Sequence, residues 1–270
     1  TQGVSSAASD VYKRQYTNSS EAPNTTTRTI SFVVNDGSSN SNTATKDVSV
    51  TSTNDAPIVT TTNGVTAFTE GNNVTSTPVV VDTGVTVTDA DTSTLTSATV
   101  SITSNYQSGQ DVLGFVNTNS TTFGNIAASY NSSTGVLTLN SASATATVAQ
   151  WQSALQSVTY TNSSEAPNTS TRTISFVVND GTSNSNTATK DVSVTSTNDA
   201  PIVTTTNGVT AFTEGNNVTS TPVVVDTGVT VTDADTSTLT SATVSITSNY
   251  QSGQDVLGFV NTNSTTFGNI

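Results

Sequence analysis

The stretch that decides the fold is TRTISFVVNDGTSNSNTATKDVSVTS, residues 171–196. In its first half apolar and polar side chains alternate, which places on one face Ile174, Phe176 and Val178. In its second half, residues 190–196 alternate valine with polar neighbours. A period of two residues is typical of half-buried β-strands. The Asn-Asp-Gly between the halves is typical of a turn, because glycine accepts positive φ and Asn or Asp caps the bend.

The same stretch occurs earlier in the chain, because the sequence contains a tandem repeat. Residues 16–126 align with 160–270 at a constant offset of 144 and differ at two positions, where Thr26 and Ser38 stand against Ser170 and Thr182. We therefore expect a fragment of a longer array. It comprises the C-terminal part of one repeat (16–55), a complete repeat (56–199) and the N-terminal part of a third (200–270).

The first 15 residues do not match the corresponding part of the complete repeat. Residues 1–15 read TQGVSSAASDVYKRQ, whereas residues 145–159 read TATVAQWQSALQSVT. The run VSSAASDVYKRQ looks like a translated sequencing adapter, so we interpret 1–15 as a non-native leader without a role in the fold. The alternative is a genuine variant of the repeat's end.

Alternation continues through the complete repeat. Further strands are expected within residues 57–62, 78–81, 84–89, 97–103, 111–116, 135–140 and 157–161. One segment differs, because Val148, Trp151 and Leu155 recur at helical spacing behind Thr147, which predicts about two turns of capped helix with Trp151 in the core rather than stacked on a sugar. The pattern predicts an all-β, two-sheet sandwich. At 144 residues the repeat exceeds the roughly 100 of an immunoglobulin-type sandwich, so an extra hairpin is expected between 104 and 156.

Composition excludes several functional classes. The chain has 270 residues, a net charge of -13, six Lys and Arg, and no Cys, Met or His. So few cations cannot neutralise a row of phosphates, so we expect no nucleic-acid partner. No apolar run approaches the roughly 18 residues that span a bilayer, so no membrane insertion is expected. Without His or Cys, nucleophilic triads are excluded, and a glycosidase carboxylate pair has no visible cleft, so we do not expect an enzyme.

Acidic residues of the complete repeat are expected to gather at its two ends. Since strands of a sandwich run alternately up and down, Asp89, Asp91 and Asp180 fall at one end and Glu70 and Glu165 at the other. Two carboxylates about 6 Å apart repel by about 2 to 3 kcal/mol at an effective dielectric of about 20. A hard cation with oxygen ligands reverses the sign. Without cysteine, such a cation is the available staple for a core with few apolar residues.

Two motifs give a more specific reading. FVVNDGTSNSNTATKDVSVTSTNDAPIV (176–203) resembles the end of a cadherin repeat, with its Asp-Gly turn, last strand and Asn-Asp linker. FTEG (68–71) and VTVTDADTSTLTSATVSI (85–102) resemble the cadherin Glu and Asp-x-Asp loop. The TVAQWQSALQSVTYTN segment makes the chain more similar still to cadherin-like repeats of very large bacterial surface proteins. This resemblance implies tandem Greek-key β-sandwiches that hold Ca²⁺ at each joint.

Carried over by position, the resemblance implies two sets of calcium ligands. The first joint comprises Asn54, Asp55, Asp89, Asp91 and Asp180, with Glu21 as a further candidate. The second comprises Glu70, Glu165, Asn198, Asp199, Asp233 and Asp235. The chain departs from the cadherin pattern at Ser52 and Ala56, at their counterparts Ser196 and Ala200, and in a shortened Ser-Ser-Glu at 163–165. One or two ions per joint are therefore expected.

The function expected from these features is mechanical. The chain is expected to be part of the extender region of a bacterial cell-surface or secreted adhesin, located outside the cell, whose repeats calcium stiffens. Its expected partners are calcium ions and, through weak adhesion, surface glycans or proteins of other cells. The alternative is a carbohydrate-binding sandwich module, with a site built on 104–156 from Tyr106, Phe115 and Tyr130.

Overall fold

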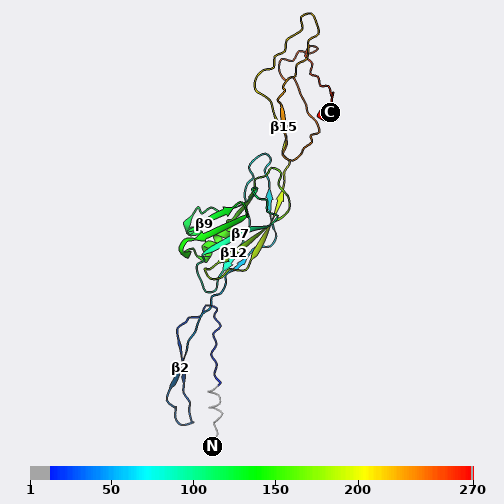
Figure 1. Cartoon of the computed structure of the whole chain (residues 1–270). Coiled ribbons are helices and arrows are strands. Elements are labelled where there is room, and N and C mark those ends of the chain that lie inside the picture. Colours follow the sequence, from blue (N-terminus) through cyan, green and yellow to red (C-terminus); the bar gives the residue numbers. More distant parts are fainter. Residues whose placement is uncertain (1–12, 269) are drawn as a thin grey trace. The chain divides into compact units, whose positions relative to one another are not determined.

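The computed structural model describes residues 13–268 and 270 (Figure 1). The chain divides into two compact units, the first ending at Asn198 and the second beginning at Asp199. The predicted all-β class is confirmed, since strands arranged in several sheets dominate and the helices are short. The leader expected at 1–15 lies outside the described residues except for its last three, so that interpretation stays a prediction.

A six-stranded sheet forms the centre of the first unit, in the order β4-β13-β12-β7-β10-β9. Its strands are β4 (Val65–Thr69), β7 (Ser97–Ser104), β9 (Ile126–Asn131), β10 (Val136–Ser141), β12 (Arg172–Asn179) and β13 (Ala188–Thr195). β13 pairs with β4 in parallel, and the other neighbours are antiparallel. β12 is hydrogen-bonded on both edges, to β13 and to β7. The stretch with the strongest alternation therefore lies in the middle of the sheet (Figure 1).

Two smaller sheets complete the strands of the complete repeat. β5 (Val79–Val80), β11 (Thr159–Asn162) and β8 (Asp111–Gly114) form an antiparallel three-stranded sheet in that order. β3 (Ile58–Thr60) pairs with β6 (Thr86–Thr88), also antiparallel. Several of these strands are shorter than the alternation predicts.

The core lies between the six-stranded and three-stranded sheets. Phe68 of β4 and Tyr160 of β11 are fully buried and meet edge to face, with ring centroids 5.2 Å apart. The apolar face predicted for β12 is buried at each of its positions, Ile174, Phe176 and Val178. Side chains from both sheets therefore share one apolar core, as in a β-sandwich.

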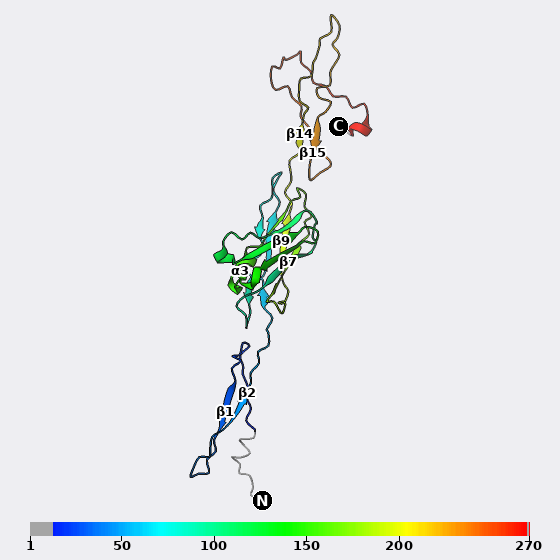
Figure 2. The same cartoon turned by 60° about the vertical axis from the view of Figure 1, so that its left-hand side comes forward.

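The predicted helix and its cap are confirmed as α3 (Val148–Gln156; Figure 2). Thr147 accepts from the backbone N–H of Gln150, and the Gln150 side chain accepts from the backbone N–H of Thr147. This reciprocal pair satisfies two of the N–H groups that a helix leaves without partners at its start. Trp151 is fully buried and donates its indole N–H to the carbonyl of Leu95 at 3.0 Å, which confirms its place in the core.

The surplus between 104 and 156 contains the extra hairpin that the length predicts. β9 and β10 pair with each other, and β10 joins them to β7 at the edge of the six-stranded sheet. The same region holds α2 (Ser120–Phe123), a 3-10 turn η1 (Ala142–Ala144) and α3. Alternation along the sequence does not predict two of the strands, β4 and β9. β9 lacks an alternating pattern because Ile126 is its one fully buried side chain.

The first unit also contains the hairpin of the preceding partial repeat, β1 (Arg28–Phe32) and β2 (Ala44–Val48). Its antiparallel register pairs Arg28 with Val48, as β12 and β13 pair Arg172 with Val192. The identical sequences therefore form the same hairpin, although the side chains of β1 are only half-buried.

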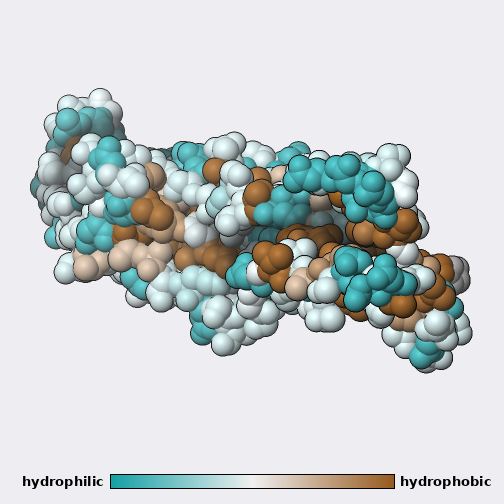
Figure 3. All heavy atoms as spheres, turned by 90° about the horizontal axis from the view of Figure 1, so that it is seen from above, coloured by the Kyte–Doolittle hydropathy of each residue, from teal (hydrophilic) through white to brown (hydrophobic). Residues whose placement is uncertain are grey.

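The second unit contains β14 (Ile202–Thr204) paired with β15 (Thr230–Thr232), and α4 (Ser264–Phe267). Many of its apolar side chains are exposed, and hydrophobic surface is visible in brown in Figure 3. Phe212 is 57% exposed, whereas Phe68, its counterpart in the complete repeat, is 0% exposed. In the described part of the second unit, Phe212 thus lacks the cover that its counterpart Phe68 has in the first unit.

Candidate metal centres

The first candidate centre is built on the loop that follows β6. The Oδ1 atom of Asp89 accepts from the backbone N–H groups of Asp91 and Thr92, at 3.1 and 2.9 Å. An aspartate that caps its own loop in this way fixes the direction of the next carboxylate. The Asp-x-Asp spacing therefore places both acidic side chains in one tight turn.

Two other segments reach the same loop. The backbone N–H of Asp55 donates to Oδ2 of Asp91 at 3.0 Å. The side chain of Asn54 donates to Oδ2 of Asp180 at 2.8 Å, although the two residues are 126 positions apart. Asp180 lies in the turn after β12, where its Oδ1 accepts from the backbone N–H of Ser183 at 2.7 Å. These hydrogen bonds thus join the linker to the Asp89 loop and to the Asp180 turn.

Asp89 and Asp91 each retain one oxygen without a hydrogen bond. Oδ2 of Asp89 and Oδ1 of Asp91 are buried and have no partner among the described residues. Burial, followed by the neighbouring Asp91 carboxylate, raises the pKa of Asp89. At neutral pH the loop therefore holds two like charges in a poorly solvated place, which costs free energy unless a cation is present.

The Asp180 carboxylate behaves differently. Burial acts to raise its pKa, but the N–H of Ser183 and the amide of Asn54 outweigh burial and lower the pKa below the ordinary value. Asp180 is therefore ionised at lower pH than Asp89. Glu21, the further candidate from the preceding partial repeat, lines with Asp55 and Asp89 a hollow of about 430 Å³.

The second candidate centre joins two ends of strands in the complete repeat. Glu70 follows β4 and accepts from the backbone N–H of Thr197, while the Thr197 hydroxyl donates to the Glu70 carbonyl at 2.9 Å. Glu165 lies in the loop between β11 and β12. Oε1 of Glu70 and Oε2 of Glu165 are both buried without a hydrogen-bond partner among the described residues.

Asp199 directly follows Asn198 at the end of the complete repeat. It is 1% exposed, and one carboxylate oxygen from each of Glu70, Glu165 and Asp199 lies within 4.8 Å of the others. Asn198, expected beside them as a ligand, is exposed. The carboxylates expected at this joint are therefore brought together within the complete repeat and its first following residue, and their role as ligands stays a prediction.

Within the second unit the Asp-x-Asp arrangement recurs. Oδ1 of Asp233 accepts from the backbone N–H groups of Asp235 and Thr236, each at 3.0 Å. The backbone N–H of Asp199 donates to Oδ2 of Asp235, as that of Asp55 donates to Asp91. Asp233 and Asp235 thus repeat the local geometry of Asp89 and Asp91.

Other buried carboxylates of the repeat are fully engaged. Asp111 is 0% exposed and accepts from Arg172 Nε at 3.1 Å and from Tyr160 and Asn162 at 2.6 Å each. The sequence gives no sign of this ion pair, because 61 residues separate its members and neither carries a local signal. The charge of Asp111 is neutralised within the protein, so it has no need of an external cation.

Asp82 is satisfied in a similar way. It is buried and accepts from the backbone N–H groups of Thr62 and Gly84 at 2.7 and 2.9 Å. Burial acts to raise its pKa, but these donors, with the Thr62 hydroxyl and the nearby Lys190 charge, lower it overall. The unpartnered oxygens of Glu70, Asp89, Asp91 and Glu165 are therefore a property of the predicted ligand positions and not of buried carboxylates in general.

The donor set fits a hard divalent cation. Glu70, Glu165 and Asp199 supply carboxylate oxygens within 4.8 Å of one another, and oxygen ligands are those that Ca²⁺ prefers. Within the part of the chain that the structure describes, Glu70, Glu165 and Asp199 form a group that could hold a metal ion. When bound, a cation would neutralise the repulsion between these carboxylates and supply the missing partner to their buried oxygens.

The aromatic residues of the alternative carbohydrate site are engaged in packing. Tyr130 donates to the backbone carbonyl of Asp111 at 2.7 Å, and Tyr106 donates to that of Ser132. Phe115 meets Phe123 edge to face, with ring centroids 5.4 Å apart. All are partly buried against the core, so no observation favours a sugar platform here.

Comparison with known proteins adds no relative. No family model matches the chain, and a search of curated proteins finds no match. In residues 13–268 and 270, every helix is too short or too polar to cross a membrane.

Proposed function

We propose that the chain is a segment of the extender region of a bacterial cell-surface or secreted adhesin, in which Ca²⁺ stabilises tandem β-sandwich repeats. In this proposal each repeat is a cadherin-like Greek-key sandwich located outside the cell. Its work is mechanical, since a stiff array holds a distal binding module away from the cell. Weak contact with glycans or proteins of other cells is a secondary role.

The observation that carries the proposal is the set of buried, unpartnered carboxylate oxygens. Among the described residues, oxygens of Asp89 and Asp91 lack hydrogen-bond partners at one group, and oxygens of Glu70 and Glu165 lack them at the other. Leaving a buried charged acceptor unsatisfied costs more than the usual 1 to 3 kcal/mol of a neutral group. A protein that keeps several such atoms in clusters needs a compensating cation, and calcium suits an all-oxygen set.

Calcium would rigidify the array through the contacts already present. Asn54 and Asp55 bond to Asp180 and Asp91, so the linker and two loops share one acidic group. If the dissociation constant is about 0.1 mM, free calcium about a hundredfold above it adds about 2.7 kcal/mol per site to the folded state. Removal of the ion would release the linker from its loops by like-charge repulsion.

The experiment that tests this function compares the melting temperature of the 270-residue chain in calcium and in chelator. We expect calcium to raise the melting temperature, and the Asp89→Asn, Asp91→Asn double variant to lose part of that rise. A melting temperature that does not respond to calcium would contradict the proposal. Glycan-array binding by the chain in chelator would favour the carbohydrate-binding alternative instead.

A further inference from the structure

Residues 61–64 connect β3 to β4 in the complete repeat and end in the pair Asn63-Gly64. Asn-Gly occurs at one other place in the sequence, its repeat copy at 207–208. Asparagine before glycine is the pair most prone to deamidation, because the backbone nitrogen of glycine attacks the asparagine side chain with no Cβ in its way. The connection from β3 to β4 is therefore chemically labile by its sequence.

The surroundings of Asn63 leave this reaction free to proceed. Asn63 and Gly64 are both exposed, and nothing lies within 4 Å of the place where a Cβ on Gly64 would stand. The φ of Gly64 is +89°, which glycine adopts at little cost. Among the described residues, no hydrogen bond engages the Gly64 N–H or the Asn63 side chain. The two reacting groups are therefore free to approach each other in contact with water.

The Asp-Gly pair in the turn after β12 lacks this freedom, although it could close the same ring. The N–H of Gly181 donates to the Asn179 side chain at 2.7 Å. Oδ1 of Asp180 accepts from the backbone N–H groups of Thr182 and Ser183, at 2.6 and 2.7 Å. The attacking nitrogen and the attacked carboxylate are thus both held by other bonds. Asn63-Gly64 is the more reactive of the two turns.

Lys190 of β13 contacts the peptide group that reacts. Its ammonium group donates to the Asn63 carbonyl at 3.2 Å, and to the carbonyl and hydroxyl of Thr62 at 3.2 and 2.9 Å. Lys190 is 6% exposed, so the cation is held in place. The Asn63 carbonyl and the Gly64 nitrogen belong to one peptide group, so negative charge that develops on the nitrogen spreads to this oxygen. A cation beside the oxygen stabilises that charge, as the donors of an oxyanion hole do.

We propose that Asn63 deamidates without an enzyme and that Lys190 promotes the reaction. The Gly64 nitrogen gives up its proton and bonds to Cγ of Asn63, and the bond from Cγ to the side-chain nitrogen breaks. That nitrogen leaves as ammonia with the proton that Gly64 gave up, which closes a succinimide ring. Water then adds to one ring carbonyl, breaks its bond to the Gly64 nitrogen and returns a proton to that nitrogen. Nothing is oxidised or reduced, and one amide becomes one carboxylate.

Lys190 also selects the product. Addition of water at the former side-chain carbonyl gives aspartate, whereas addition at the former backbone carbonyl gives isoaspartate, in which the chain continues through Cγ. The Lys190 ammonium lies at the backbone carbonyl of Asn63, so it stabilises the oxyanion that forms there. It then pairs with the α-carboxylate that ring opening releases. Isoaspartate is therefore the expected major product.

The product changes the connection into β4. Isoaspartate adds one backbone atom and one negative charge between β3 and β4. β4 pairs in parallel with β13, and its Phe68 is 0% exposed in the core. A longer and more charged connection should loosen this pairing and lower the stability of the complete repeat as the protein ages. The reaction requires no metal and is independent of the proposed calcium sites.

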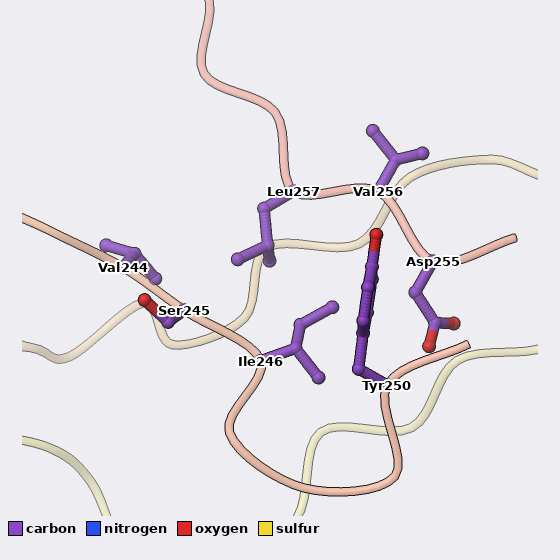
Figure 4. Close-up of a pocket in the computed structure, with 7 residues that line it drawn as sticks. All are labelled: Val244, Ser245, Ile246, Tyr250, Asp255, Val256 and Leu257. Atoms are coloured by element: carbon purple, nitrogen blue, oxygen red, sulfur yellow. The ribbon is translucent and has the colours of Figure 1, made fainter. Parts of the chain in front are cut away.

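The copy at Asn207-Gly208 provides a reference within the same molecule. It lies in the second unit, where Ile246, Tyr250 and Leu257 surround an open hollow (Figure 4). Adding the repeat offset of 144 to Lys190 gives a position beyond residue 270, so Asn207 has no equivalent lysine in this sequence. Asn207 should therefore deamidate at the rate of an unassisted Asn-Gly pair.

The test follows deamidation of the folded 270-residue chain during incubation at neutral pH. Trypsin cuts after Arg172 and so separates Asn63 from Asn207. Mass spectrometry of the peptides gives the rate at each asparagine, and a methyltransferase specific for isoaspartate gives the share of that product. We expect Asn63 to convert faster than Asn207 by about threefold or more, and to yield mainly isoaspartate.

Variants of Lys190 test its part in the reaction. Lys190→Met should slow Asn63 to the rate of Asn207 and leave Asn207 unchanged, whereas Lys190→Arg keeps the positive charge and should keep most of the acceleration. The matched control is Lys46→Met, the identical change at an exposed position on β2, which should leave both rates unchanged. Trp151 fluorescence checks that each variant is folded.

The structural consequence has its own readout. Ageing should lower the urea midpoint of the parent, followed by Trp151 fluorescence, whereas Asn63→Gln should keep its midpoint because glutamine does not close the five-membered ring. An Asn63 that keeps its amide while Asn207 converts would overturn the proposal. Equal rates at Asn63 in the parent and in Lys190→Met would overturn the role of Lys190.

Discussion

The backbone N–H of Asp55 donates to the carboxylate of Asp91 at 3.0 Å, and this bond ties the linker to the acidic loop after β6. Oδ1 of Asp91 and Oδ2 of Asp89 are buried without hydrogen-bond partners in the part of the chain that the structure describes. The bond from Asp55 therefore holds the linker close to carboxylates whose charge is not compensated there. Stability of this region should therefore depend on pH and on cations, in directions that the geometry fixes.

The pH dependence should follow Asp89 when metal is removed. Its pKa is raised above the ordinary 3.8, so the folded state binds its proton more tightly than the unfolded state. In chelator, the Asp89 contribution therefore falls as pH rises from about 3.8 through the raised pKa, and the full penalty is present above it. Asp89→Asn should be more stable than the parent at neutral pH, with an advantage that shrinks as the pH is lowered.

Urea unfolding of parent and Asp89→Asn, followed by Trp151 fluorescence, measures this difference at each pH. Asp82 and Asp180 have lowered pKa values and lose their stabilisation as pH falls, but they are common to both proteins and cancel in the comparison. Calcium should reverse the order, making the parent the more stable protein. A difference that is constant across the pH range would rule out Asp89 as its source.

The buried ion pair should matter in one repeat and not in its partial copy. Arg172→Met leaves the Asp111 carboxylate buried without its cation, which should lower the free energy of unfolding by about 3 to 5 kcal/mol. Arg28→Met makes the identical change at a half-buried position where the described residues show no ion pair, and should stay within about 0.5 kcal/mol. Chemical denaturation at low protein concentration measures both, and equal losses would contradict the assignment.

Trp151 should contribute through both its hydrogen bond and its volume. Trp151→Phe leaves the Leu95 carbonyl without its donor and should cost about 1 to 3 kcal/mol. Trp151→Ala also opens a cavity beneath α3 and should cost about 3 to 5 kcal/mol. Circular dichroism replaces fluorescence as the probe, since Trp151 is the sole tryptophan. Equal losses from the two variants would show that the ring's volume is not in the core.

Much of the fold could be predicted from the sequence because its signals are local. The alternation in 171–196 predicts two strands that the structure places at the middle of the large sheet, and helical spacing behind Thr147 predicts α3 and its cap. β9 was missed because it lies at a sheet edge with Ile126 alone fully buried, so its sequence carries no period of two. Edge strands are specified by their neighbour more than by their own residues.

The candidate sites also combine local features, which the sequence shows, with long-range contacts, which it does not show. The tight turn of Asp89 and Asp91 follows from their spacing, whereas the approach of Asn54 to Asp180 joins residues 126 positions apart and is expected only through the resemblance to cadherin repeats. The Asp111–Arg172 pair has neither a motif nor a family position, so nothing in the sequence distinguished it from a solvated charge. Long-range pairs of single residues become visible only once the strands are placed.

The most direct test of cation binding by the carboxylate groups is calorimetric titration of calcium into the 270-residue chain. The parent is compared with the Asp89→Asn, Asp91→Asn double variant and with Asp47→Asn, Asp191→Asn, which removes two carboxylates that bind threonine hydroxyls instead. We predict saturable heats in the parent and the control, and the loss of at least one site in the Asp89, Asp91 variant. Heats that are indistinguishable among the three proteins would contradict the assignment of these residues as calcium ligands.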